Sequence, residues 1–77
     1  MDLREVFAAN LRRLRHEKGM SQEDLAYSAE VNRTYISKLE KGVSYVGLEI
    51  IGKLAEVLAV EPAALLKLPL KKSARSK

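Results

Sequence analysis

Apolar residues along this 77-residue chain recur at spacings of three and four positions, the period of an α-helix, and strand-like alternation is absent. The first such stripe runs over residues 3–18 and stops before Gly19, a residue type that often ends helices. Its apolar members are Leu3, Val6, Phe7, Leu11 and Leu14. We therefore expect an all-α fold with its first helix at the N-terminus.

Two short helices follow, each preceded by a polar residue suited to N-capping. Ser21 and Asp24 have the spacing of a capping box, and the helix that they open has Leu25, Ala26 and Ala29 on its buried side. Asn32 is the next cap and opens a helix over residues 33–41. Two short helices with a tight turn between them are typical of a helix-turn-helix, whose second helix enters the major groove of DNA.

The C-terminal third predicts two further helices. The fourth has an apolar stripe of Leu48, Ile51, Leu54, Ala55 and Leu58. Pro62 opens a short fifth helix that ends near Leu66. Gly52 lies inside the fourth helix, where glycine costs about 1 kcal/mol relative to alanine, so we expect a close helix contact there. Residues 1–70 should form one five-helix domain, and we expect residues 71–77 to be a disordered basic tail.

Charge and composition exclude several classes of protein. The net charge is +4, but four basic residues fall in the last seven positions, so residues 1–70 are neutral overall. There is no cysteine, and the single histidine, His16, has no neighbours at metal-ligand spacing. No catalytic motif is present either. We expect no enzymatic activity, cofactor, metal or small-molecule ligand, and a cytoplasmic protein that makes no contact with membranes.

The helix expected over residues 33–41 has two different faces. At 100° per residue, its polar side chains fall within about 140° of arc; they are Arg33, Thr34, Ser37, Lys38 and Lys41. The opposite side carries Tyr35, Ile36, Leu39 and Glu40. One face suits a protein core and the other suits the phosphates and base edges of DNA. Taken alone, such a polar face is more often an ordinary solvated surface.

Several runs of residues resemble a known family. SQEDLA (21–26) and NRTYISKLEKG (32–42) resemble the signature of Cro and lambda-repressor-like (Xre) helix-turn-helix proteins, and LEIIGKLA (48–55) with LAV (58–60) resembles their fourth helix. The resemblance covers about residues 5–66. RTYIS (33–37) is similar to the recognition helix of restriction–modification controller proteins. The resemblance implies a transcription regulator that reads a palindromic operator in double-stranded DNA as a homodimer.

The candidate DNA contacts divide into base readers and phosphate binders. Arg33 can pair with guanine O6 and N7, the commonest specific contact, so it ranks first among the base readers. The others are Thr34, Ser37 and Lys38. Gln22 lies at a helix N-terminus, which favours a phosphate, and the resemblance implies that it clamps the DNA backbone and braces the recognition helix. Further phosphate candidates are Tyr35, Lys41, Ser44 and Tyr45. For Tyr35, simple packing is an equal alternative.

A structural salt bridge is expected between Arg15 and Glu40. Glu40 falls on the buried side of its helix, where a carboxylate without a partner would be costly. Arg15 borders the apolar stripe of the first helix, and the resemblance implies a matching arginine–glutamate pair at these two positions. We therefore assign both residues to stability and not to reading DNA.

The C-terminal third carries more apolar surface than one small core can absorb, which favours a two-fold dimer. The candidate interface residues are Ile50, Val57, Leu65, Leu66 and Leu68. In the alternative arrangement, the first helix covers Ile50 and Val57 while the leucines close the core. A different function also stays open, a protein-interaction module of the same fold such as an antitoxin or coregulator. Such a module would not need the polar side chains on one open face of residues 33–41.

Overall fold

The structure is a computed structural model that describes residues 1–68. Its elements are α1 (Leu3–Glu17), α2 (Gln22–Ala29), α3 (Arg33–Lys41), α4 (Leu48–Leu58) and η1 (Pro62–Leu66). The expected all-α class is confirmed, but the fifth element is a 3₁₀ helix, in which the Ala64 N–H donates to the Glu61 carbonyl. The expected basic tail, residues 71–77, lies outside the described residues.

The predicted N-caps define where α2 and α3 begin. Ser21 Oγ accepts from the Asp24 N–H at 2.9 Å, and the Asp24 carboxylate accepts from the Ser21 N–H at 3.0 Å, which completes a capping box. This backbone hydrogen bond from Ser21 holds the pKa of Asp24 below its usual value. Asn32 Oδ1 accepts from the Thr34 N–H at 2.7 Å. Local hydrogen bonds therefore fix the first turn of both α2 and α3.

The turn between α2 and α3 depends on a left-handed residue that is not glycine. Glu30 has φ 60° and ψ 43°, a conformation that costs a residue with a side chain roughly 1–2 kcal/mol. Two hydrogen bonds offset this cost, from the Glu30 N–H to the Tyr27 carbonyl and from the Val31 N–H to the Ala26 carbonyl. Val31 is half-buried and packs on the core, which directs the chain into α3.

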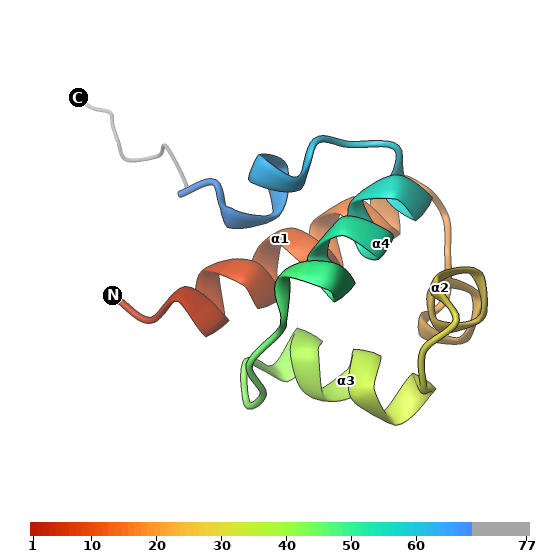
Figure 1. Cartoon of the computed structure of the whole chain (residues 1–77), viewed down its shortest axis with the longest axis horizontal. Coiled ribbons are helices and arrows are strands. Elements are labelled where there is room, and N and C mark those ends of the chain that lie inside the picture. Colours follow the sequence, from red (N-terminus) through yellow and green to blue (C-terminus); the bar gives the residue numbers. More distant parts are fainter. Residues whose placement is uncertain (69–77) are drawn as a thin grey trace.

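The helices enclose one core. α1 packs against α3 and η1, while α2 packs against α3 and α4, and α4 also packs against η1. Figure 1 shows α3 along one edge of the molecule and η1 at the opposite edge. The largest fully buried side chains come from all five elements; they are Leu11, Leu25, Ile36, Leu39, Leu54, Leu58 and Leu65. This packing leaves one long face of α3 free at the edge.

Three expectations about packing are wrong. Leu3 and Leu48 share the apolar stripes of their helices but are 55% and 85% exposed, because each is the first residue of its helix. Gly52 makes no close helix contact, since a Cβ placed on it would meet nothing within 4 Å. Leu65 is fully buried in the core, so it cannot belong to a dimer interface of this fold. Helical periodicity identifies a face, but it does not show whether another element covers that face.

A buried asparagine joins η1 to α1. Asn10 Nδ2 donates to the carbonyls of Leu65 at 3.0 Å and Lys67 at 2.9 Å, and Asn10 Oδ1 accepts from Arg13 Nη2 at 3.2 Å. These bonds satisfy carbonyls at the end of η1 that have no partner within so short a helix. No local signal in the sequence marks this role of Asn10, because its partners lie 55 and 57 positions away.

Candidate nucleic-acid interface

α3 presents one polar face to solvent. Arg33, Thr34, Lys38 and Lys41 are exposed and Ser37 is half-buried. The opposite side is anchored in the core, where Ile36, Leu39 and Glu40 are buried. Within residues 1–68, none of the three cations on the open face forms an ion pair with a carboxylate. Their charges are therefore available to an external polyanion.

The Arg15–Glu40 ion pair lies beneath this helix. Arg15 Nε donates to Glu40 Oε2 at 2.6 Å and Arg15 Nη2 donates to Glu40 Oε1 at 3.0 Å, and the side chains are only 10% and 3% exposed. The bond to Glu40 raises the pKa of Arg15 above its ordinary value. Burial alone would raise the pKa of Glu40, but hydrogen bonds from Arg15 and Gln22 outweigh it and hold that pKa below its usual range. The salt bridge expected from the sequence is present.

Gln22 connects α2 to the same carboxylate. Its Nε2 donates to Glu40 Oε1 at 3.1 Å, while the side chain stays half-buried. The Glu40 carboxylate on α3 therefore accepts hydrogen bonds from Arg15 on α1 and from Gln22, the first residue of α2. The bracing contact that the resemblance implied for Gln22 exists in the protein without DNA.

A further contact supports the C-terminal end of α3. Arg12 on α1 donates through Nη1 to the backbone carbonyl of Glu40. A cation at this end of a helix satisfies a carbonyl that lacks an intrahelical partner and interacts favourably with the helix dipole. Sequence pattern alone does not mark Arg12, because the contact joins residues 28 positions apart. Arg12 and Arg15 of α1 therefore both donate hydrogen bonds to Glu40 of α3.

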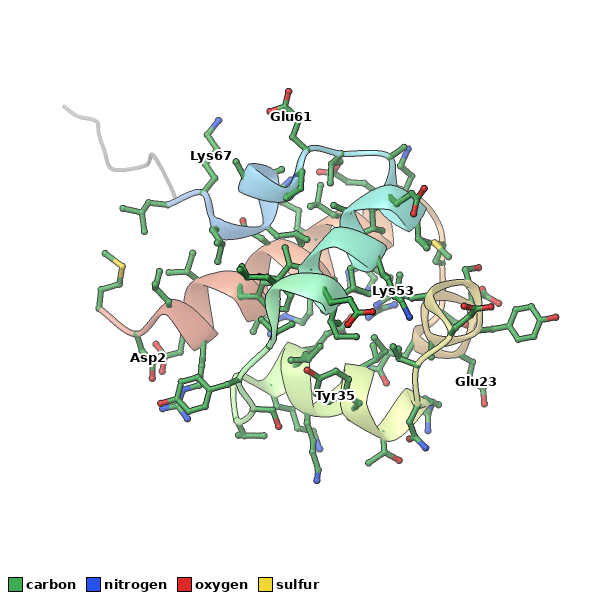
Figure 2. All side chains as sticks on the ribbon, viewed as in Figure 1. Asp2, Glu23, Tyr35, Lys53, Glu61 and Lys67 are labelled. Carbon is green, nitrogen blue, oxygen red and sulfur yellow. The ribbon has the colours of Figure 1, made fainter. Side chains whose placement is uncertain are left out.

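The loop over residues 43–47 follows α3 and borders the polar face. The Tyr35 hydroxyl donates to the Tyr45 carbonyl at 3.2 Å, so Tyr35, which Figure 2 labels on α3, ties the helix to this loop. Ser44 is half-buried, and it lines a hollow beside α3 together with Asn32, Thr34, Tyr35 and Lys38. The phosphate candidate Ser44 thus lies next to the base-reading candidates Thr34 and Lys38, and Tyr45 is bonded to Tyr35.

Residues 1–68 contain no group of three or more His, Cys, Asp or Glu side chains arranged to hold a metal ion. None of the helices in the same part is both long enough and apolar enough to cross a membrane.

An open polar face on the second helix of a helix-turn-helix defines a class of DNA-binding regulators. Residues 11–65 match the helix-turn-helix family HTH_3. The chain belongs to this family of Cro/Xre-type transcription regulators, as its resemblance implied.

Three proteins similar to this chain illustrate how much sequence and structure it shares with known regulators. Control protein C.BamHI of Bacillus amyloliquefaciens is 41% identical over 66 residues, which are 84% of this chain and 82% of that protein. The hypothetical transcription factor NHTF from Neisseria has a crystal structure with a TM-score of 0.87 and 41% identity, over 92% of this chain and 82% of that one. The restriction–modification controller protein C.Esp1396I, a tetramer in complex with its natural 35-base-pair operator, has a TM-score of 0.76 and 31% identity, over 84% and 86% of the chains.

Proposed function

We propose that this protein is a controller-type regulator that reads a palindromic operator as a homodimer. The observation that carries the proposal is the division of α3 into an open face of hydrogen-bond donors and a face locked into the core. A rigid helix with exposed donors can present them to base edges in the major groove. The similarity to C.BamHI and C.Esp1396I supports the controller subtype.

Within this proposal the side chains have separate tasks. Arg33 opens α3 and reads guanine, and Thr34, Ser37 and Lys38 contact neighbouring base edges. Gln22 at the N-terminus of α2 binds a phosphate while its amide also holds Glu40. Lys41, Ser44 and Tyr45 contact phosphates beside the base-reading side chains, whereas Tyr35 donates its hydroxyl to the Tyr45 carbonyl and holds the loop. Phosphate contacts fix the register of the protein on the duplex, and base contacts select the sequence.

The proposed dimer uses what remains exposed in the C-terminal third. Leu66 and Leu68 are exposed, whereas Ile50 and Val57 are half-buried and pack partly on the core of their own chain. A second copy covering this surface would remove it from water and supply a second recognition helix, which operator affinity requires.

Binding to the DNA upstream of the protein's own gene tests the proposal. A gel shift with that fragment at moderate salt should form a complex that excess random DNA does not displace. A protein-interaction module, such as an antitoxin or coregulator, would show no such preference, and that result would overturn the proposal. For this function we propose a cytoplasmic location, as expected from the sequence.

A further inference from the structure

The start of α1 contacts the loop that follows the recognition helix. The guanidinium carbon of Arg4 lies 4.7 Å from the centroid of the Tyr45 ring, within the range of a cation–π interaction. Asp2 holds that guanidinium in place, because its carboxylate accepts from Arg4 Nη2 at 2.9 Å and from Nε at 3.3 Å. Asp2 also caps α1 by accepting from the Arg4 backbone N–H at 2.9 Å. The Arg4 side chain is therefore fixed to the end of a helix.

The loop is attached to α3 from its other side. The Tyr45 carbonyl accepts the Tyr35 hydroxyl at 3.2 Å, and the Val43 N–H donates to the Lys38 carbonyl at 3.2 Å. Gly42 passes close to the first turn of α1, because a Cβ on it would lie 3.7 Å from the Arg4 carbonyl oxygen. Figure 2 shows Asp2 at the start of α1 and Tyr35 on α3, with the loop visible between these elements in Figure 1. A continuous path of contacts thus runs from Asp2 to the recognition helix.

Tyr45 itself is 77% exposed, so few other contacts restrain its ring. Loop 43–47 has no regular secondary structure that would fix it instead. The cation–π contact is consequently the main restraint on the ring among the described contacts. A ring free to rotate would place its hydroxyl at a phosphate for only part of the time, and fixing it in advance reduces the entropy lost on binding.

We infer that Arg4 is a positioning residue for DNA binding, which holds Tyr45 and loop 43–47 in place and does not itself touch the DNA. The inference rests on the proposed function and adds to it a residue outside the helix-turn-helix. A cation–π contact at an exposed site corresponds to about a two- to fivefold change in an equilibrium constant. In a dimer the loss would occur at both half-sites and would multiply.

Salt dependence separates positioning from direct contact. An arginine that neutralises a phosphate contributes about 0.9 to the slope of log affinity against log salt, whereas a neutral tyrosine hydroxyl contributes nothing. Arg4→Ala should therefore weaken operator binding about two- to fivefold per subunit without changing the slope. Arg4→Lys should recover most of the affinity, because an ammonium also binds an aromatic face. Lys18→Ala is the matched control for loss of one charge, since Lys18 is exposed at the C-terminal end of α1, away from Arg4 and loop 43–47.

The same variants are tested without DNA by amide hydrogen exchange at Gly42 and Val43, whose N–H groups donate to carbonyls of α3. Exchange at these amides should be faster in Arg4→Ala than in the original protein, and unchanged in Lys18→Ala. A slope that falls by about 0.9 in Arg4→Ala would show a direct phosphate contact and overturn the inference. Unchanged exchange in Arg4→Ala, or an operator affinity equal to that of Lys18→Ala, would also overturn it. If the original protein binds no operator, the proposed function fails, while exchange still shows whether Arg4 restrains the loop.

Discussion

Gln22 Nε2 lies 3.1 Å from Glu40 Oε1, so the residue proposed to clamp the DNA backbone is bonded to the carboxylate that anchors the recognition helix. Arg15 holds the same carboxylate from α1. In the proposed function, a phosphate bound at the N-terminus of α2 would be linked through this one acceptor to the position of α3. Binding of the DNA backbone and the orientation of the proposed base-reading face would then share the same junction.

The first prediction concerns the stability of this junction. Glu40→Ala removes the carboxylate and leaves the Arg15 guanidinium largely buried without its partner. The free energy of unfolding should fall on the order of 3 kcal/mol, as expected when one partner of a buried pair is removed. Urea denaturation followed by circular dichroism measures the change. Glu23→Ala, an exposed acid on α2, is the control and should be nearly neutral. Equal stability of the two variants would contradict the assigned role of the pair.

The pH dependence of stability provides a second prediction. The folded pKa of Glu40 is lowered, so the folded state binds fewer protons at this group than the unfolded state does. The stability from the pair is therefore fully present above about pH 4.3, the ordinary pKa of glutamate, and is lost as the pH falls through the lower folded value. Comparison with Glu40→Gln cancels the contributions of other carboxylates. The stability difference between the two proteins should shrink from pH 7 to pH 3, and a constant difference would refute the assignment.

Local signals in the sequence were sufficient to predict much of this site. Ser21 and Asn32 are caps because their side chains reach backbone groups two or three residues away, which spacing alone reveals. The two faces of α3 follow from helical period. The Arg15–Glu40 pair could be expected because a buried carboxylate needs a cation and the family resemblance indicated which one.

Contacts that depend on how distant segments approach one another could not be predicted in this way. Asn10 donates hydrogen bonds to the carbonyls of residues 65 and 67. The cation–π contact of Arg4 with the Tyr45 ring joins α1 to a loop about 40 positions later. Nothing near these residues in the sequence marks them, because their partners are brought close only by the complete fold. The burial of Leu65 and the exposure of Leu48 likewise depend on which segments the complete fold brings together.

A third prediction separates backbone binding from base reading. Gln22→Ala removes a neutral phosphate contact and a bond to Glu40, so it should weaken binding to operator and random DNA alike, by about tenfold. The ratio between the two affinities should stay nearly unchanged, because Arg15 still holds Glu40 and with it α3. Phosphate contacts themselves carry no sequence information. Fluorescence anisotropy with both DNAs measures this ratio. A loss confined to the operator would mean that Gln22 reads bases.

The dimer surface is tested by Leu66→Glu. The side chain is partly exposed at the end of η1, so a charge there should be tolerated in the monomer but should be costly in an apolar interface. Sedimentation equilibrium at micromolar concentration should show a dimer for the original protein and a monomer for the variant. Ser28→Glu adds the same charge on the exposed surface of α2 and should remain dimeric. Far-UV circular dichroism verifies that both variants are folded, and a dimeric Leu66→Glu protein would rule out this surface.

In the proposed function, the open face of α3 selects a DNA sequence. The most direct measurement is the ratio of operator to random-DNA affinity, at one fixed salt concentration, for the original protein and for Arg33→Ala. The original protein should strongly prefer the operator. Arg33→Ala should lose about 1–3 kcal/mol of discrimination per half-site, with binding to random DNA reduced only by the loss of one charge. An unchanged ratio in Arg33→Ala would contradict the claim.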